Sequence, residues 1–308
     1  MGYNSPLFVT DWPSYNRSLV RRGEILFSYG FLDEWDMVLA KMNENKKGRK
    51  FVYPDSFILA VGYIRICFHL PYRQTEGVIK ATGKSLPSHP SYGHMCKRVN
   101  SLKAGFNGPF KTDDDDLVIA IDSTGIRVTN RGQWMSEKWG GARDKRKKRG
   151  YLKIHVAVNT KTGEILALEV TDEKVHDGTM MKKLVKRVLR TRYHGEKVKS
   201  VLADGAYDSN ANFKFLDDGG IKPAIRVRRN SVVSTKNSKA RNGEVWQQTR
   251  DFLKWKRKRR YGMRWMAESA FSSIKRTFGE HVSSTRFQNM VKEMVLKVSL
   301  YNMFRRVT

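Results

Sequence analysis

Residues 117–125 have the sequence Leu-Val-Ile-Ala-Ile-Asp-Ser-Thr-Gly, and residues 200–208 have the sequence Ser-Val-Leu-Ala-Asp-Gly-Ala-Tyr-Asp. In each stretch an apolar run typical of a buried strand leads to an aspartate, Asp122 in the first and Asp204 in the second. An ionised carboxylate at the end of an apolar strand is costly unless it is paired, solvated or bound to a cation. If the two strands are neighbours, the aspartates lie side by side and a divalent cation would remove their repulsion. The alternative is that each aspartate only caps the turn before Gly125 or Gly205.

Strands and helices alternate around these two stretches. Strands are expected at residues 117–121, 153–158, 165–170, 198–203 and 223–227, and helices at 176–193, 209–218, 262–278 and 288–305. This order favours an α/β layer structure with a mixed sheet.

The first hundred residues have a helical pattern instead. Helices are expected at residues 19–29, 32–42 and 55–69, followed by two short helices at 73–80 and 91–102 joined by a turn. These two, with Arg73 on the first and Lys97 and Arg98 on the second, fit a DNA-reading helix-turn-helix or plain helical packing about equally well. Residues 103–116 contain two glycines, a proline and four consecutive aspartates, which is loop chemistry. We therefore expect a helical DNA-binding or dimerisation region at 1–112 and a catalytic α/β domain at 113–308.

The charge balance points to an anionic partner. The chain has 308 residues, with 59 Lys and Arg and 30 Asp and Glu, so its formal net charge is +29. Nucleic acid is the first candidate partner and an anionic membrane surface the second. The two cysteines argue against a disulfide framework and a Cys-rich zinc site. With no membrane-spanning run and no signal peptide, we expect a soluble intracellular protein.

A third acidic residue occurs in the helix expected at 262–278. Tyr261, Arg264, Glu268 and Lys275 are spaced +3, +4 and +7, which places them within roughly 60° of one helix face. Glu268 could complete a site with Asp122 and Asp204, and hard oxygen ligands of this kind favour Mg²⁺ or Mn²⁺. The competing interpretation is a solvated face on which Arg264 and Glu268 form an intrahelical ion pair.

Basic stretches surround these residues. Residues 222–264 contain 15 Lys or Arg and 2 acidic residues, and residues 127–153 contain 10 and 2. Tryptophans lie within both stretches, which suits contacts to phosphates and to exposed bases. We expect residues 231–243 to be a basic, partly disordered surface loop. The basic run that leads into the Glu268 helix consists of Lys254, Lys256, Arg257, Lys258, Arg259 and Arg260.

These motifs together resemble the DDE transposases of prokaryotic insertion sequences. The resemblance is carried by Asp122-Ser-Thr-Gly, by Asp204-Gly-Ala-Tyr-Asp and by the helix pattern Tyr261-x2-Arg264-x3-Glu268-x6-Lys275. The helix pattern is typical of the group that contains insertion-sequence families four and five. Residues 70–77, Leu-Pro-Tyr-Arg-Gln-Thr-Glu-Gly, with Pro90-Ser-Tyr and Lys97-Arg98, are most similar to family five, so the resemblance covers nearly the whole chain.

The resemblance implies an RNase H-like catalytic domain with a five-stranded mixed sheet. It implies that Asp122, Asp204 and Glu268 bind two Mg²⁺ ions, with Mn²⁺ as a substitute, and that Tyr261, Arg264 and Lys275 hold the DNA backbone near the scissile phosphate. One ion would activate the attacking water or 3′-hydroxyl, and the other would stabilise the leaving oxygen. The implied substrates are double-stranded element ends with inverted repeats and target DNA, held in a synaptic homodimer at the nucleoid in the cytoplasm.

Two features of the sequence limit what the resemblance to the transposases implies, and two alternative functions remain. The interval of 64 residues from Asp204 to Glu268 leaves room for a basic connection but not for a large inserted domain, so contacts that such a domain makes to a DNA hairpin elsewhere in the group are not carried over and a hairpin mechanism is not predicted. His176 and Asp177 fall where a His-Asp pair often occurs in the family, but a helix N-terminus explains Asp177 and we assign the pair no catalytic role. The alternatives are a non-catalytic DNA-binding regulator derived from a transposase and, less favoured, an RNA-processing nuclease of similar fold.

Overall fold

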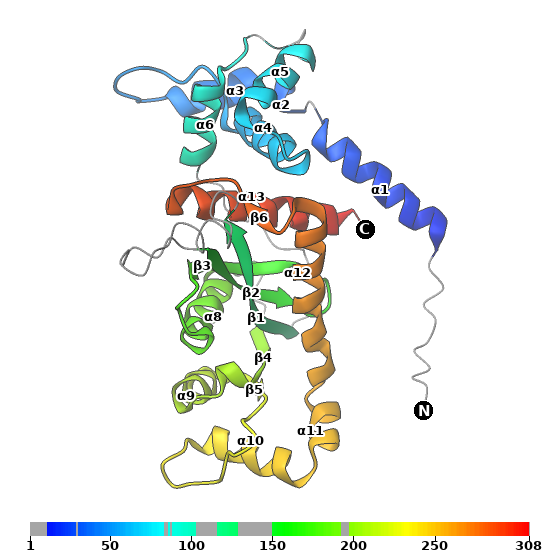
Figure 1. Ribbon diagram of the computed structural model, residues 1–308, viewed down its shortest axis with the longest axis vertical. Helices are drawn as coiled ribbons and strands as arrows, with labels where there is room; N and C mark the ends of the chain where they lie inside the picture. The colour runs from blue at the N-terminus through cyan, green and yellow to red at the C-terminus, as the bar shows by residue number, and fades with distance from the viewer. Residues whose placement is uncertain are drawn as a thin grey trace, which may run out of the picture. The chain divides into compact units, whose positions relative to one another are not determined.

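The computed structural model describes residues 11–28, 30–82, 86, 88–102, 116–128, 150–191 and 197–307. The chain divides into two compact units, Met1–Ala104 with Met303–Thr308, and Gly105–Asn302 (Figure 1). The stretch at 103–115, which holds most of the aspartate run, and the basic stretch at 129–149, with Trp134 and Trp139, lie outside the described residues.

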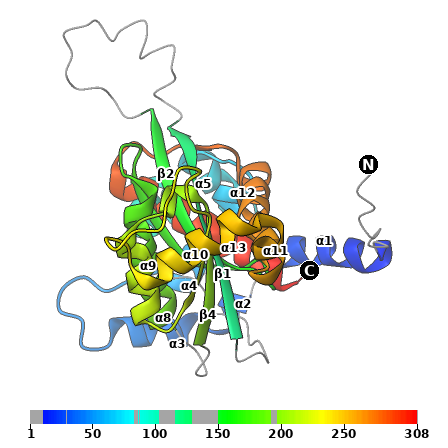
Figure 2. The ribbon, with the colours of Figure 1, turned by 90° about the horizontal axis from the view of Figure 1, so that it is seen from below.

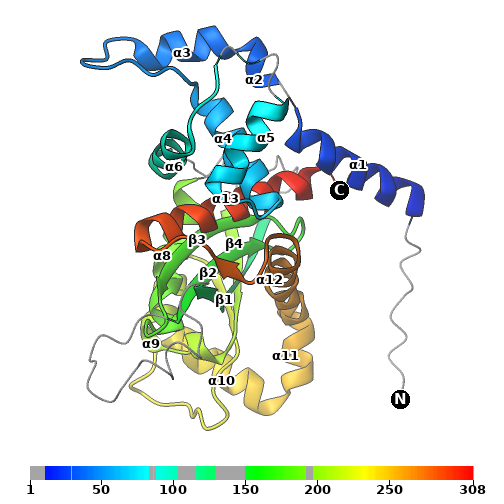
Figure 3. The same ribbon diagram turned by 45° about the horizontal axis from the view of Figure 1, so that its top comes forward.

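The N-terminal unit is helical, as the sequence predicts. Helix α4 (Asp55–Cys67) is apolar on most of its surface, and the other helices of the unit pack around it (Figure 3). Helix α1 begins seven residues earlier than expected because the Asp11 side chain caps it by accepting a hydrogen bond from the Ser14 amide. The other helices are α1 (Trp12–Leu26), α2 (Gly30–Asp33), α3 (Trp35–Asn43), α5 (Tyr72–Thr82) and α6 (Tyr92–Ser101).

The two short helices α5 and α6 form a helical pair joined by polar contacts. The Glu76 carboxylate accepts a hydrogen bond from the Tyr92 amide at 2.7 Å and pairs with Lys80 one turn away. The Tyr92 amide is in the first turn of α6 and has no acceptor within the helix, so the Glu76 carboxylate supplies its hydrogen-bond partner. The Arg73 guanidinium lies 5.1 Å from the centre of the Tyr92 ring. The two short helices that the sequence predicts are therefore present, and α5 is held to the start of α6.

The C-terminal unit contains a mixed sheet of strand order β3-β2-β1-β4-β5. Strand β1 pairs antiparallel with β2, which pairs antiparallel with β3, while β1–β4 and β4–β5 are parallel. The strands are β1 (Asp116–Val128), β2 (Tyr151–Asn159), β3 (Ile165–Asp172), β4 (Lys197–Ala203) and β5 (Lys222–Ile225). This is the RNase H-like arrangement, and the predicted five-stranded mixed sheet is confirmed. A two-residue strand, β6 (His281–Val282), adds a parallel pairing to the far end of β1.

Helices cover both faces of this sheet. Helices α8 (Met181–Arg190) and α9 (Asn210–Asp218) lie on one side of the strands, and α12 (Trp265–Phe278) lies on the other (Figure 2). Ile119 and Ile121 of β1 are fully buried in the core under α8 and α9. Because side chains alternate along a strand, Asp122 points to the opposite face, where α12 packs on β1 and β2. The alternation of β1 thus places the aspartate on the side of the Glu268 helix.

Three expectations for this unit need correction. Strand β1 does not end at Asp122 but continues to Val128, because its pairing with β2 extends to Arg127. The helix expected at 176–193 begins as a 3-10 turn, η1 (Asp177–Met180), before α8. The loop expected at 231–243 is wrong in its second half, where α10 (Lys239–Arg250) begins and is followed by α11 (Phe252–Lys258).

The last helix, α13 (Phe287–Arg306), is tied to the sheet through a residue of this unit. The buried Asn302 carboxamide accepts a hydrogen bond from the Ile165 amide at 3.0 Å and donates one to the Ile165 carbonyl at 2.8 Å. Both polar groups at the start of β3 are thereby satisfied away from water. Within the described residues, no helix is long and apolar enough to cross a membrane.

Candidate active site

The two aspartates lie level with each other on neighbouring strands. Ala120 of β1 is the register partner of Leu202 of β4, and Asp122 and Asp204 each follow two residues later. The pairing of β4 with β1 stops there, so both carboxylates lie where the parallel ladder ends. An edge of this kind is where ligands bind in α/β sheets.

Each aspartate also makes a local backbone contact. Oδ1 of Asp122 accepts a hydrogen bond from the Ser123 amide at 2.8 Å. Oδ1 of Asp204 accepts one from the Ala206 amide at 2.9 Å and caps the 3-10 turn η2 (Gly205–Tyr207). The turn-capping role considered from the sequence is therefore present at Asp204. It engages one oxygen of each carboxylate, and a carboxylate has lone pairs for further ligands.

The glutamate comes from the first turn of α12, on the same face of the sheet. The sequence predicts that Tyr261, Arg264, Glu268 and Lys275 lie on one face of a single helix. This prediction is wrong for Tyr261 and Arg264. Tyr261 and Arg264 belong to a separate 3-10 turn, η3 (Tyr261–Arg264), which directly precedes α12. Glu268 and Lys275 lie on α12 itself.

Arg264 lies between two of the three carboxylates. Its Nη1 donates to Oδ2 of Asp122 at 2.9 Å, and its Nη2 donates to Oε1 of Glu268 at 2.5 Å. The ion pair of Arg264 with Glu268 that the sequence suggests is thus present, and the same guanidinium extends it to β1, 142 residues away. Among the described residues, no three metal-binding side chains are already gathered for an ion.

The electrostatics of Asp122 show that the acidic groups affect one another. Burial raises the pKa of Asp122, the Ser123 amide and Arg264 lower it, and the charges of Asp204 and Glu268 raise it further. Both other carboxylates therefore lie close enough to repel Asp122. For Arg264, burial opposes the charged form, but the charges of Asp122, Tyr261 and Glu268 outweigh burial and its pKa is raised.

These residues fit a divalent hard cation. The three candidate ligands offer only carboxylate oxygens, which Mg²⁺ and Mn²⁺ prefer. Their mutual repulsion is the kind that a bound cation relieves. In this structure the guanidinium of Arg264 supplies the positive charge between Asp122 and Glu268.

An open groove of about 390 Å³ begins at these carboxylates. Its lining includes Asp122, Glu268, Thr124, Lys275 and Arg276. The Lys275 ammonium donates to the Thr124 hydroxyl at 2.9 Å, which holds this cation at the groove wall beside β1. Acidic groups at one end and cations along the wall suit a phosphodiester backbone approaching a metal site.

Tyr261 contributes to the site from a buried position. Only 8% of the residue is exposed, and its ring lies 4.9 Å from the ring of Trp255. Burial raises the pKa of Tyr261, and Arg264 and Asp204 are among the charged groups that act on it. The ring of Tyr261 thus packs on Trp255, and its phenol is close enough to Arg264 and Asp204 for their charges to act on it.

The connection from β5 to η3 is folded around a buried acid, Glu244 of α10. The Glu244 carboxylate accepts a hydrogen bond from the Trp255 indole at 2.5 Å and forms an ion pair with Arg259. Burial raises the pKa of Glu244, and these two partners oppose that shift. Arg259, predicted to bind DNA, is thus engaged inside the protein. The remaining cations of the basic run are exposed: Lys254, Lys256, Arg257, Lys258 and Arg260.

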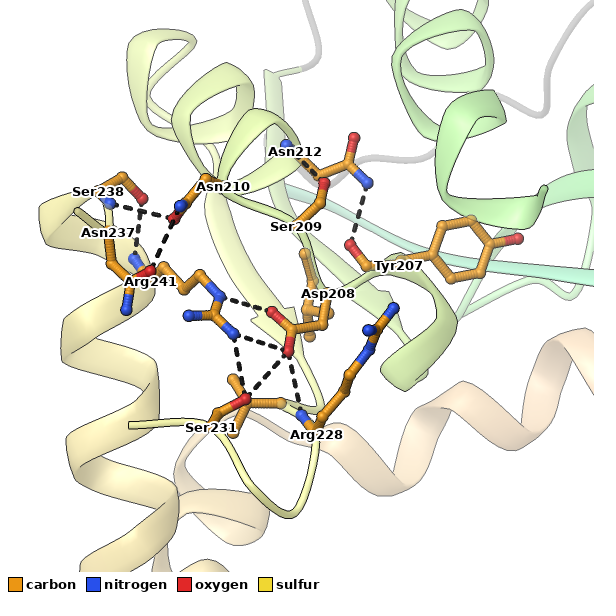
Figure 4. Close-up of polar contacts among 12 residues, drawn as sticks. Tyr207, Asp208, Ser209, Asn210, Asn212, Arg228, Ser231, Asn237, Ser238 and Arg241 are labelled. Atoms are coloured by element: carbon orange, nitrogen blue, oxygen red, sulfur yellow. Dashed lines mark hydrogen bonds and ion pairs between the residues drawn. The ribbon is translucent and has the colours of Figure 1, made fainter. Parts of the chain in front are cut away.

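A second buried acid, Asp208, has no role predicted from the sequence. Its carboxylate accepts two hydrogen bonds from Arg241, at 2.7 and 3.0 Å, and others from the Arg228 amide and the Ser231 hydroxyl (Figure 4). Burial alone would raise the pKa of Asp208, but these partners lower it. The contact fixes α10 and the preceding loop to the segment that carries Asp204. Its only sequence signal is its place as the last residue of the Asp204-Gly-Ala-Tyr-Asp motif.

The predicted DNA-binding residues of the N-terminal unit lie on α5 and α6. Arg73 and Lys97 are exposed. Arg98 donates to the Asp55 carboxylate at 2.8 Å and to the Tyr53 carbonyl at 3.2 Å, and it stacks 4.2 Å over the Phe51 ring. Its contacts hold α6 to the start of α4, so Arg98 has a packing role in this structure.

An RNase H-like sheet with Asp122 and Asp204 at the point where β1 and β4 part is the arrangement expected of a DDE-type transposase domain. The sequence agrees: residues 113–303 match the family described as "Transposase DDE domain", and residues 20–131 match a second family with the same description. The chain belongs to the transposase DDE-domain family. Among solved structures, it is similar to a piggyBac transposase in a synaptic complex with hairpin DNA, with 11% sequence identity, a TM-score of 0.42, and coverage of 93% of this chain and 74% of that chain.

Proposed function

We propose that this protein is an active DNA transposase that cleaves the ends of an insertion element and joins them to target DNA by two-metal-ion phosphoryl transfer. The observation that carries this proposal is the meeting of Asp122, from β1, with Glu268, from α12, around one guanidinium. Asp204 lies level with Asp122 on the adjacent strand. Glu268 lies on the same face of the sheet, and Lys275 and Arg276 line the groove beside Asp122 and Glu268, together with Glu280.

Asp122, Asp204 and Glu268 are the residues that would hold the metal ions. Bound Mg²⁺, or Mn²⁺ in its place, would supply Lewis-acid stabilisation of the attacking and leaving oxygens. The protein's part is to orient the carboxylates, which it does for the two aspartates through the Ser123 and Ala206 amides. The side chain of Asp122 is only 16% exposed. Electrostatic interactions at this position are stronger than in water because the effective dielectric constant is lower at a buried site.

Two cations next to Asp122 and Glu268 would grip the DNA backbone. Lys275, held by Thr124, and Arg264 can each reach a phosphate as charged donors, and Arg264 can do so with both nitrogens. Tyr261 would support Arg264 from the buried side. The exposed cations of α11 continue the positive surface toward a longer duplex.

The finer parts of the proposal follow from the sequence motifs. The substrates are double-stranded terminal inverted repeats and target DNA, the active species is a synaptic homodimer, and the reaction takes place at the nucleoid. Residues 1–112 would bind DNA or form the dimer, and the element would belong to the group of insertion-sequence families four and five, most like family five.

The test uses linear DNA carrying the element's own ends. Purified full-length protein is incubated with this DNA in Mg²⁺, in Mn²⁺ or in EDTA, and cleavage at the element boundary is measured. We expect Asp122→Asn, Asp204→Asn and Glu268→Gln each to lower cleavage on the order of 100-fold or more. DNA binding, measured separately, should be largely retained.

The matched control is Glu280→Gln. Glu280 lines the same groove and is exposed, and within the described part of the chain its carboxylate forms no ion pair with Arg264. This variant should cleave like the wild type. Cleavage by Glu268→Gln at the wild-type rate would refute the proposal, and binding of the ends without cleavage in any metal would favour the DNA-binding regulator.

A further inference from the structure

Arg264 satisfies two carboxylates at once with two different nitrogens. Nη1 serves Asp122 and Nη2 serves Glu268, so the planar fork of one guanidinium spans the two acids. Its side chain is 22% exposed and carries a full positive charge between the two negative ones. The fit is that of a counter-ion between two anions.

This placement conflicts with metal binding by the same oxygens. A Mg²⁺ ion needs carboxylate oxygens at about 2.0–2.1 Å in near-octahedral geometry. Oδ2 of Asp122 and Oε1 of Glu268 each have a guanidinium nitrogen within hydrogen-bond distance. A cation placed between the acids would also be repelled by the guanidinium at short range. A metal ion that binds both acids through Oδ2 of Asp122 and Oε1 of Glu268 therefore competes with the guanidinium for the space between them.

We propose that Arg264 is the resident counter-ion of the metal site and that it must leave Asp122 and Glu268 before they bind a metal ion. A DNA phosphate at the groove is the ligand that would draw it away, since one phosphate can accept hydrogen bonds from both Nη1 and Nη2. This inference rests on the proposed function, because it takes the two acids as metal ligands.

The surroundings of Arg264 support such a movement. It lies in the 3-10 turn η3 rather than within α12, and the groove beside Glu268 is open. Glu268 itself has 58% of its side chain exposed, so its own ion pair is accessible to solvent. Breaking this half of the contact costs little, whereas the half with Asp122, whose side chain is 16% exposed, costs more and is the part for which a phosphate must compensate.

The consequence is a thermodynamic coupling between DNA and metal. If DNA removes Arg264 from the carboxylates, it raises the affinity of the site for metal, and bound metal raises the affinity for DNA by the same factor. The DNA-free protein would bind metal weakly, so the site would remain largely without metal until DNA is bound. Arg264 would then act as a positioning residue for the metal ligands as well as a DNA contact.

The test measures Mn²⁺ binding to the full-length protein without DNA, by the electron paramagnetic resonance signal of free Mn²⁺. We expect Arg264→Gln to bind Mn²⁺ roughly tenfold more tightly than the wild type, since the competing charge is gone. Arg264→Lys, which keeps the charge, should remain close to the wild type. The matched control is Lys275→Gln, which removes another cation of the groove, one bound to a hydroxyl and not to a carboxylate. It should change the affinity less than about threefold.

The outcomes separate the inference from the proposed function. Unchanged Mn²⁺ affinity in Arg264→Gln, or an equal gain in Lys275→Gln, overturns the inference. Adding Asp122→Asn or Glu268→Gln to Arg264→Gln should weaken Mn²⁺ binding again, and failure of both additions to do so would instead refute the metal site of the proposed function.

A second measurement needs only the wild-type protein and decides the question if Arg264→Gln does not fold. Mn²⁺ binding is compared with and without a short duplex of the element end, after subtraction of the Mn²⁺ bound by the duplex alone. Roughly tenfold tighter binding with DNA supports the coupling. Equal affinity in the two conditions overturns it.

Discussion

Asp122 makes a local backbone contact and a long-range ion pair at the same time. One of its oxygens accepts the Ser123 amide, which is a local backbone contact, and the other pairs with Arg264 from a distant turn. Asp204 likewise caps η2 while lying level with Asp122. A carboxylate has about four lone-pair sites, so a structural contact does not exclude a functional one. At Asp122 the local contact engages Oδ1 and leaves Oδ2 for Arg264.

His155 gives a prediction for the dependence of stability on pH. It is fully buried on β2, with Nε2 2.9 Å from the Thr171 hydroxyl, and burial lowers its pKa to about 4 from an ordinary 6.5. Asp177 opposes this shift and Lys153 adds to it. Between these two pKa values the unfolded chain binds more protons than the folded one. The contribution of His155 to the free energy of unfolding is therefore fully present above pH 6.5 and is lost as the pH drops toward 4. The loss is on the order of 2–3 kcal/mol by pH 4.

We expect His155→Gln to flatten this part of the stability curve, because the group that binds the proton only when unfolded is gone. The measurement is the midpoint of thermal unfolding at a series of pH values from about 7.5 down to about 4. His281→Gln, on β6 of the same unit, is the control and should keep the slope. A wild-type slope in His155→Gln would contradict the assignment.

Among the helices and strands, α10 shows most clearly what the sequence pattern does not reveal. Its sequence, Lys-Ala-Arg-Asn-Gly-Glu-Val-Trp-Gln-Gln-Thr-Arg, has no apolar stripe at helical spacing, which is why the sequence predicts a loop over its first residues. Polar contacts to other elements hold the helix instead. Arg241 binds Asp208, and Glu244 binds Trp255 and Arg259.

Gln248 adds a third polar contact, between α10 and the edge of the sheet. Its carboxamide accepts a hydrogen bond from the Val227 amide at 3.0 Å and donates one to the Ile225 carbonyl at 2.8 Å. Both bonds go to backbone groups at the end of β5, where the strand has no further sheet partner in the described topology. The side chain of Gln248 therefore takes the place of a neighbouring strand there.

The Asp208–Arg241 pair gives a prediction for this helix. Removing one partner of a buried ion pair leaves the other unpaired, which typically costs about 3–5 kcal/mol. We expect Asp208→Asn to loosen α10, so that its amides (Lys239–Arg250) exchange hydrogen faster while those of β1 and β2 stay protected. The measurement is amide hydrogen exchange of the folded protein.

The control for this pair is Asn210→Ala. Asn210 also joins the start of α9 to the loop before α10, through Lys236 and Asn237, but its contacts are exposed and uncharged. This variant should change the exchange of α10 much less than Asp208→Asn does. Equal exchange in Asp208→Asn and the wild type would show that α10 is held by its other contacts.

Elements with a regular burial pattern can be predicted well from the sequence. Strands β2, β3 and β4 and helices α4, α9 and α13 lie within a few residues of their expected positions, because each carries its own periodicity of apolar side chains. The predicted bounds are wrong where contacts with a neighbouring element determine the secondary structure. Strand β1 is longer because β2 continues to pair with it, and Tyr261 leaves the helix because its ring packs on Trp255.

For the molecule as a whole, the net charge of +29 predicts strongly salt-dependent DNA binding. The exposed cations of α11 lie on the part of the chain that leads into η3 and the carboxylates. Replacing Lys256, Arg257 and Lys258 with Gln should lower the slope of log affinity against log salt by about 0.9 for each residue that contacts a phosphate. The measurement is the dissociation constant of an element-end duplex over a range of salt concentrations.

The control is a second triple variant, with three exposed lysines replaced on the helix that covers the other face of the sheet. Lys182, Lys183 and Lys186 are exposed on α8, which covers the face opposite to α12. Replacing these three with Gln removes the same charge and should leave the slope nearly unchanged. Equal slopes for the two triple variants would contradict the placement of DNA along α11 and α12.

The class of fold and the identity of the acidic residues can be read from the amino-acid sequence without further help. Apolar runs leading to Asp122 and Asp204 specify buried strands, and the order of strands and helices specifies a mixed α/β sheet, because burial periodicity is a local property of the chain. The partners that these residues meet are set by folding in three dimensions. Arg264 bridges Asp122 and Glu268, Asp208 binds Arg241, and Arg259 is taken up by Glu244. The contacts Arg264–Asp122 and Arg241–Asp208 join segments 142 and 33 residues apart, and their distances are set only when the sheet and its covering helices pack together.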